Sequence, residues 1–271
     1  MKNKQKNQGL AFAGIDIGSR SIELTLLEAD TVIEQRIAPT TFDPVSQCKK
    51  LLEGIGFRAI VATGYGRELF AENFSELKPH TFTEIKAYAL GAGFLYPEVR
   101  AVLDIGGQDT KTIALSETGK VTKFEMNDRC AAGTGKFLEF MANSFQISVE
   151  DFGKLGMAGR DEIIISNVCT VFAESEVISL MARGEKPENI ALGVHKSIIG
   201  RTLAMLSRVG VEFPLLFAGG VARNPCMRKL LKKEISGKII FPEKPEFVGS
   251  IGAAISGRMI EKEEKFAQEG P

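Results

Sequence analysis

The sequence predicts an α/β protein built from two similar halves, and three observations support this. First, the segment Ala-Gly-Ile-Asp-Ile-Gly-Ser at residues 13–19 returns as Ala-Val-Leu-Asp-Ile-Gly-Gly at 101–107, a constant separation of 88 residues. Second, strand patterns in each half are followed by alternating helix and strand patterns. Third, 271 residues with 44% hydrophobic content can bury one large core or two medium ones.

The first half opens with three strands that we expect to pair antiparallel. An apolar strand runs into a turn carrying Asp16 and Gly18, a second strand returns over 22–27, and a third covers 31–37. Helix and strand patterns then alternate, with a helix over 44–53, a strand over 59–63 and a helix over 84–95.

The second half repeats the opening strands and is richer in helix. Strands are expected over 101–105, 110–115 and 120–126, with a buried strand over 215–218; the expected helices are 132–144, 171–182, 187–209, 225–233 and 249–261. Such halves are typical of an α/β protein with a ligand cleft between lobes. The expected division is a flexible segment 1–9, a first lobe 10–95, a second lobe 96–262 and a tail 263–271.

Charge and cysteine content exclude several classes of function. The 34 basic residues balance the 34 acidic ones, so nothing favours binding to nucleic acid or to an anionic membrane. The apolar run after the polar residues 1–8 is broken by Asp16, which excludes a signal peptide or a membrane span, and we expect a cytoplasmic protein. Four cysteines in that compartment are not a disulfide framework.

Each copy of the repeated segment places an aspartate and glycine between two strands. This pattern is typical of a phosphate-binding hairpin. Glycine lets backbone N–H groups approach an anion, and a strand-end carboxylate can hold Mg²⁺ through its water shell. Two such hairpins facing each other would grip a triphosphate tail. We expect Asp16 and Asp104 near Mg²⁺, and nucleotide contacts from Gly18, Ser19, Arg20, Ser21, Gly106, Gly107 and Gly133.

A third glycine turn, Ala-Gly-Gly-Val at 218–221, ends a buried strand and precedes a helix. We expect Gly219 and Gly220 there to form a surface on which an adenosine lies. Two competing nucleotide motifs fail: the P-loop pattern at 130–137 has Cys and Phe where it needs Gly and Ser or Thr. The glycines at 64–66 lack the final glycine of a dinucleotide fingerprint.

Cys130 and Cys169 each precede a helical pattern, and neither has a second thiol within four residues. They are therefore no compact Cys-x-x-Cys site. A four-thiolate iron–sulfur cluster needs four ligands, and two copies of the chain would supply both cysteines twice. Cys48 and Cys226 are expected to be buried free thiols; if they were ligands, one chain alone would assemble a Cys₄ site.

The three glycine turns together resemble the superfamily of sugar kinases, actin and heat-shock chaperone ATPases. Within it, the segments Asn-Asp-x-Cys-Ala-Ala-Gly-Thr-Gly at 127–135 and Cys-Thr-Val-Phe-Ala-Glu-Ser-Glu-Val at 169–177 are similar to the signature of ATP-dependent activators of 2-hydroxyacyl-CoA dehydratases, with relatives in benzoyl-CoA reductases and double-cubane-cluster reductases. The resemblance covers residues 12–258. It implies an actin-like ATPase fold, ribonuclease-H-like, with duplicated lobes and a nucleotide cleft.

The resemblance also implies a homodimer that holds one [4Fe-4S] cluster through Cys130 and Cys169 of each copy. It implies use of ATP and Mg²⁺ to pass an electron to an acceptor iron–sulfur dehydratase or reductase component, with ferredoxin or flavodoxin as a suitable donor and ADP as product. The chain departs from that branch at Arg20, at Glu23 where a lysine is common, and at Tyr88 where a histidine is common.

Several roles stay open at the level of sequence. Gln108 or Asp109 would position the attacking water, although Asp109 also suits a simple hairpin turn. Glu174 and Glu176 suit either the first turn of a helix or a nucleotide contact. His80 and His195 are expected to be structural. Two rival functions remain, namely a small-molecule kinase and a nucleotide-gated regulatory ATPase without redox chemistry.

Overall fold

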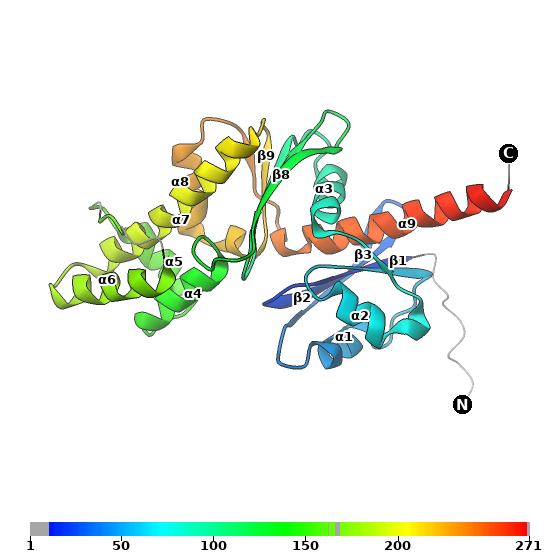
Figure 1. The fold of residues 1–271 in the computed structure, drawn as a ribbon, viewed down its shortest axis with the longest axis horizontal. Coiled ribbons are helices and arrows are strands. Elements are labelled where there is room, and N and C mark those ends of the chain that lie inside the picture. The colour runs from blue at the N-terminus through cyan, green and yellow to red at the C-terminus, as the bar shows by residue number, and fades with distance from the viewer. Residues whose placement is uncertain (1–10, 162, 166–168, 270–271) are drawn as a thin grey trace. The chain divides into compact units, whose positions relative to one another are not determined.

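The computed structural model describes residues 11–161, 163–165 and 169–269. The chain divides into two compact units (Figure 1). Unit 1 comprises Met1–Glu98, Glu117–Val121 and Glu246–Pro271, and unit 2 comprises Val99–Ser116 and Thr122–Pro245. The expectation of a flexible segment 1–9 lies outside the described residues. No helix of the described chain is long and apolar enough to cross a membrane.

Unit 1 contains a five-stranded sheet of order β3-β2-β1-β4-β5. Its strands are β1 Phe12–Ile17, β2 Ser21–Glu28, β3 Thr31–Pro39, β4 Ala59–Thr63 and β5 His80–Thr81. The first three pair antiparallel as expected, while β4 lies parallel to β1 on its other side. A parallel neighbour requires a crossover connection, which the helix between β3 and β4 supplies.

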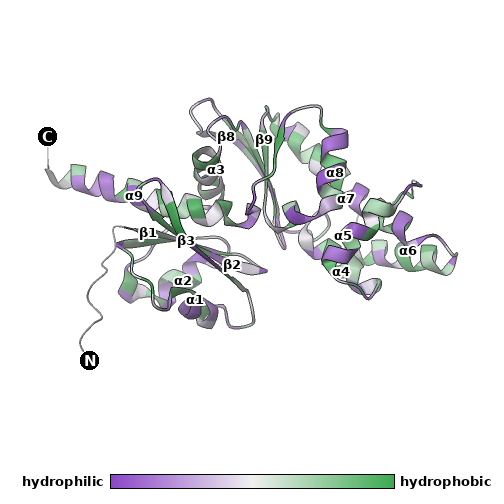
Figure 2. Ribbon diagram, turned by 180° about the vertical axis from the view of Figure 1, so that it is seen from behind, coloured by the Kyte–Doolittle hydropathy of each residue, from purple (hydrophilic) through white to green (hydrophobic). Residues whose placement is uncertain are grey.

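Helices cover both faces of this sheet. On one face, α1 Pro44–Leu52, α2 Arg67–Asn73 and the short η1 Ser75–Leu77 enclose a core with the apolar residues of β1 and β2. On the other face, α3 Glu84–Leu95 and α9 Val248–Glu269 pack together. The short η3 Pro245–Phe247 directly precedes α9. The end of α9 nearest the C-terminus is mostly hydrophilic (Figure 2).

Helix α9 differs from the sequence-based division, which grouped residues up to 262 with the second lobe. It belongs to unit 1, because its glycines and small residues let it lie directly against α3. A Cβ on Gly91 would collide with the carbonyl oxygen of Val248, and one on Gly252 with that of Ala87. Such contacts between distant segments leave no periodic pattern in the sequence.

Unit 2 repeats the sheet, in the order β10-β9-β6-β7-β8. Its strands are β6 Ala101–Ile105, β7 Thr110–Leu115, β8 Val121–Asn127, β9 Leu215–Ala218 and β10 Ile239–Ile240. As β1 does in unit 1, β6 pairs antiparallel with the strand after it and parallel with a later one. The echo in the sequence therefore corresponds to a repeated topology.

The helices of unit 2 enclose its largest core. They are α4 Gly135–Ser144, α5 Val149–Ala158, α6 Thr170–Ala182, α7 Pro187–Val209 and α8 Pro225–Glu234, with the short η2 Gly220–Arg223. The sequence patterns did not predict α2, α5, β5 or β10. Helix α4 begins at Gly135 and not at the expected residue 132, because Gly133 has a positive φ of 94° that interrupts helical geometry.

A polar cluster lies within this core. Nδ1 of the fully buried His195 lies 2.7 Å from the carbonyl oxygen of Ala191, and its Nε2 lies 3.0 Å from Nδ2 of Asn224. The Asn224 side chain in turn accepts hydrogen bonds from the backbone of Cys226 and Met227 at the start of α8. Burial lowers the pKa of His195 from its ordinary 6.5 to about 4, so the ring stays neutral and structural.

We expect a difference between two neighbouring glycines of α3. Gly91→Ala places a methyl group against the Val248 carbonyl and should destabilise the protein by about 2 kcal/mol. Gly93→Ala, the matched control, meets nothing within 4 Å and should stabilise it by about 0.5–1 kcal/mol. Urea unfolding followed by circular dichroism measures both; equal effects would contradict the close packing of α3 on α9.

The buried His195 predicts a specific loss of stability in acid. Its folded-state pKa lies below the unfolded one, so its stabilising contribution is complete above pH 6.5 and is lost as the pH falls towards 4. Relative to His195→Gln, the wild type should lose about 1.4 kcal/mol per pH unit within that window. The free energy of unfolding of both proteins can be measured by urea unfolding at each pH. If it changes with pH equally in the two proteins, the His195 ring is not neutral and buried as described.

Candidate functional site

The first glycine hairpin lies at the end of β1 in unit 1. Asp16, 5% exposed, is the last residue but one of β1 and its strand-end carboxylate. The turn is closed by the Gly18 N–H, which donates to the Ser21 carbonyl at 3.0 Å. Thr40 braces the turn because its hydroxyl donates to the Gly18 carbonyl at 2.7 Å. Gly18 and Ser19 are half-buried, and Arg20 is exposed. The backbone of this turn therefore has a fixed shape.

The second hairpin, in unit 2, is closed in the same way by the Gly106 N–H, which donates to the Asp109 carbonyl at 3.0 Å. It is also tied by an ionic bridge. Lys111, 3% exposed, places its Nζ 3.1 Å from Asp104 and 2.8 Å from Asp109. Asp109 is thus a fixed member of this bridge and not a loose turn carboxylate, whereas the side chain of Gln108 is exposed.

Lys111 was not singled out from the sequence, although the internal repeat aligns this residue with Glu23. The register pairs Asp104 with Lys111 and Asp16 with Glu23, so Glu23 and Lys111 occupy equivalent positions of the two repeats. Both side chains are buried. The unusual Glu23 therefore lies at the strand end of the first hairpin, opposite Asp16.

A glycine in a left-handed conformation lies beside each strand-end aspartate. Gly64 follows β4 with φ 84°, and Gly219 follows β9 with φ 80°. A Cβ on Gly64 would collide with the Asp16 carboxylate, and one on Gly219 with that of Asp104. The turn at 64–66 does not match a dinucleotide motif. In unit 1 it is the counterpart of the turn at 218–221, which is expected to hold adenosine in unit 2.

Tyr88, another of the three departures from the family branch, also lies near the first hairpin. A Cβ on Gly249 would collide with the Asp16 carboxylate and with the Tyr88 ring, so both side chains flank the start of α9. Tyr88 is 7% exposed. The departures at Glu23 and Tyr88 thus fall around one carboxylate, that of Asp16.

The loop that carries Cys130 is held from within unit 2. The thiol is exposed. Asn127 donates to the Cys130 and Ala132 carbonyls, at 2.9 and 3.2 Å, and Thr110 donates to the Gly133 carbonyl at 2.8 Å. Gly133, expected to contact nucleotide, therefore serves as an acceptor that joins this loop to the second hairpin.

Helix α4 is joined to the same hairpin. The N–H groups of Gly135 and Lys136 donate to the carbonyls of Gly106 and Gly107, at 2.9 and 2.7 Å. These donors belong to the first turn of a helix, where N–H groups lack helical partners. Since they are already bonded, this end of α4 does not offer them to a ligand beside Cys130.

Cys169 is the N-cap residue of α6, and its thiol is exposed. Residues 166–168, which precede it, lie outside the described residues. Glu174, for which a helix-end role and a nucleotide contact were both open, accepts a hydrogen bond from the Ser144 hydroxyl at 3.2 Å. This bond joins α6 to the end of α4.

Burial separates the four cysteines into two classes. Cys48 and Cys226 are 3% and 1% exposed, and burial raises the pKa of each thiol to about 12. Since metals bind the thiolate, these two are poor ligands. Cys130 and Cys169 are exposed. Among the residues that the structure describes, no group of three or more His, Cys, Asp or Glu is placed to hold a metal ion.

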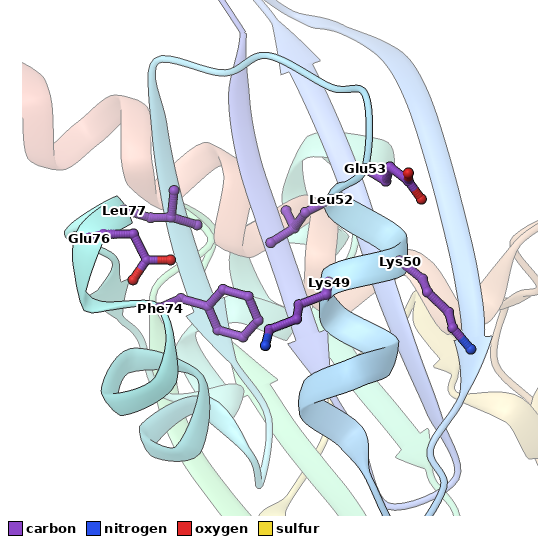
Figure 3. A pocket seen from close by; sticks show the side chains of 7 residues that line it. All are labelled: Lys49, Lys50, Leu52, Glu53, Phe74, Glu76 and Leu77. Atoms are coloured by element: carbon purple, nitrogen blue, oxygen red, sulfur yellow. The ribbon is translucent and has the colours of Figure 1, made fainter.

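A shallow pocket elsewhere in unit 1 contains none of the expected site residues. It lies between the last turn of α1 and η1, where Leu52, Phe74 and Leu77 form an apolar floor and lysines and glutamates form the rim (Figure 3). Lys49 and Glu53 belong to that rim. With mixed charges on the rim, the pocket selects no class of ligand.

Comparison with known proteins identifies the family. The model of the BadF/BadG/BcrA/BcrD ATPase family matches residues 13–257. The chain belongs to this family. It is 37% identical to the 2-hydroxyisocaproyl-CoA dehydratase activator of Clostridioides difficile, over 89% of this chain and 92% of that protein. It is 36% identical to the (R)-2-hydroxyglutaryl-CoA dehydratase activating ATPase of Acidaminococcus fermentans, over 89% and 95%.

Solved structures confirm the actin-like ATPase fold of this BadF/BadG/BcrA/BcrD family member. The C. difficile activator with bound ADPNP superimposes with a TM-score of 0.85 at 35% identity, over 96% of this chain and 98% of that one. Component A of the A. fermentans dehydratase gives a TM-score of 0.86 at 33% identity, over 94% and 100%. A ROK family glucokinase, at 13% identity and a TM-score of 0.56, shares the fold alone.

We expect the Lys111 bridge to be essential for the stability of this ATPase. Lys111→Met leaves two neighbouring carboxylates without their cation and should destabilise the protein by about 3 kcal/mol. Adding Asp109→Asn should recover part of that loss, because one of the two charges is removed. Urea unfolding of the single and double variants measures the coupling between Lys111 and Asp109; additive effects would show that this contact of the bridge contributes nothing.

Proposed function

We propose that this ATPase hydrolyses ATP to deliver a low-potential electron, through a [4Fe-4S] cluster shared by two copies, to a partner iron–sulfur enzyme. The observation that carries the proposal is the contrast among the cysteines: Cys130 and Cys169 are exposed, while Cys48 and Cys226 are buried. The relatives named as dehydratase activators support the same role.

The nucleotide part rests on the two hairpins. Their turns suit phosphate oxygens, because glycine lets the main chain come close to an anion and the other backbone N–H groups of the turn can then face it. Asp16 and Asp104 would face the hydrated Mg²⁺. The exposed Gln108 would orient the attacking water, and Asp109, fixed by Lys111, would hold the turn in shape. A relative has been solved with ADPNP, which supports nucleotide binding here.

The cluster part rests on the ligand count. One chain offers two exposed thiols, and a [4Fe-4S] cluster takes four, so two copies would each contribute Cys130 and Cys169. When bound, the cluster supplies one-electron chemistry at low potential. The chain's own part is to hold two thiolates at the ends of hydrogen-bonded segments that lead back to the second hairpin.

The proposed partners follow from this role. The electron acceptor would be an iron–sulfur component of the 2-hydroxyacyl-CoA dehydratase, benzoyl-CoA reductase or double-cubane type. One relative, a benzoyl-CoA reductase subunit from Thauera aromatica, is 32% identical over 95% of this chain. Ferredoxin or flavodoxin would supply electrons in the cytoplasm. Nucleotide state would alter the thiol loops and so gate the transfer.

Iron content under anaerobic conditions tests this proposal. The wild type should be brown, dimeric and hold about four iron atoms per dimer. Cys130→Ala and Cys169→Ala should each lose the iron, because each removes two of the four ligands from a dimer. The matched controls Cys48→Ala and Cys226→Ala should keep it.

Two results would reject the cluster. Colourless, iron-free wild type after anaerobic purification would favour a small-molecule kinase or a regulatory ATPase. Loss of iron from all four cysteine variants would place the ligands within one chain, and iron retained in Cys130→Ala or Cys169→Ala would show that this thiol is not a ligand.

A further inference from the structure

The four carbonyl groups of residues 130–133 all accept hydrogen bonds from side chains of unit 2. Asn127 uses its amide group for two of them, those of Cys130 and Ala132. The Thr134 hydroxyl donates to the Ala131 carbonyl at 2.6 Å, and the Thr110 hydroxyl donates to the Gly133 carbonyl. In exposed loops, water commonly satisfies such carbonyls. Here the protein fixes the direction of each peptide around an exposed thiol.

Two of these donors come from the sheet. Asn127 is the last residue of β8, and Thr110 is the first residue of β7 and only 1% exposed. These strands are neighbours in the sheet. Because β-strands are rigid relative to loops, both donors hold the loop to a firm base.

Thr110 also belongs to the hairpin proposed to bind phosphate, because it directly follows Asp109. Its hydroxyl connects that hairpin to Gly133, three residues from the thiol. The Gly106 and Gly107 carbonyls connect the same hairpin to the start of α4. A displacement of the hairpin is therefore transmitted to both ends of the segment 133–136.

We propose that Asn127 and Thr110 are positioning residues for Cys130, with Thr110 linking that thiol to the phosphate-binding hairpin. The inference rests on the proposed function, since it gives the link between nucleotide and thiol a specific route. Asn127 orients the loop independently of nucleotide, whereas Thr110 transmits the state of the hairpin. Both residues act through backbone carbonyls of the loop.

Hydrogen exchange in the iron-free protein tests the Asn127 part without any cluster. Asn127→Asp keeps the shape of the side chain but replaces two N–H donors by a carboxylate that repels the carbonyls. Exchange at residues 131–136 should accelerate about tenfold, the effect of losing one net hydrogen bond. Asn73→Asp is the matched control, because Asn73 also donates to a backbone carbonyl, that of Leu69. Unchanged exchange in Asn127→Asp would overturn this part.

Nucleotide response tests the Thr110 part. In the wild type, ADPNP should slow exchange at the hairpin, residues 104–109, and at the thiol loop, residues 130–133. Thr110→Val removes the hydroxyl and should abolish the slowing at the loop while leaving it at the hairpin, and Thr110→Ser should restore it. Thr122→Val is the control, since the Thr122 hydroxyl donates to the Ala114 carbonyl. A loop response that persists in Thr110→Val would overturn the link.

The iron-loaded protein gives a readout that folding alone would not change. Loss of either donor should alter the midpoint potential of the cluster, because it frees the peptide groups next to the ligating thiol to reorient and the polar groups around a cluster tune its potential. Both control variants should keep the wild-type value. If the wild type binds no iron while the exchange results hold, the proposed function fails and the positioning role of Asn127 stands.

Discussion

The buried ammonium of Lys111, between the carboxylates of Asp104 and Asp109, is the interaction on which the site of unit 2 depends. It compensates two charges that burial would otherwise make unfavourable, and it keeps the hairpin in one shape. That shape presents the Gly106 and Gly107 carbonyls to the start of α4 and the Thr110 hydroxyl to Gly133. The position of Cys130 therefore depends on an ion bridge far from it in the sequence.

The two repeats keep one backbone plan but differ in charge. Each has a strand-end aspartate, a closed turn and a left-handed glycine beside the carboxylate. At the position opposite the aspartate, however, unit 1 has Glu23 and unit 2 has Lys111. Gly64 and Gly219 tolerate no side chain, because their Cβ positions are occupied by the aspartates. The shared geometry is thus steric, while the electrostatic character of each hairpin is set by one residue.

The sequence anticipated the elements whose pattern is local. Periodic apolar residues predicted β1 to β4, β6 to β9 and most helices within a few residues, and the echo at Asp16 and Asp104 predicted the repeated topology. Three short elements, α2, β5 and β10, carried too few apolar positions to be found. Helix α5, which is as long as α4, was missed although its apolar positions follow a helical period. The expectation that Cys48 and Cys226 are buried free thiols is confirmed, and the structure adds that Cys130 and Cys169 are exposed.

The sequence by itself determined the two hairpins and the glycine turn after β9, because each depends on neighbouring residues. Only the tertiary structure decided that α9 packs in unit 1 and that Glu174 bonds Ser144. The same holds for Lys111 between its two carboxylates and for Thr110 at Gly133. These contacts join side chains to partners whose proximity is created by strand pairing and helix packing, which no local pattern records.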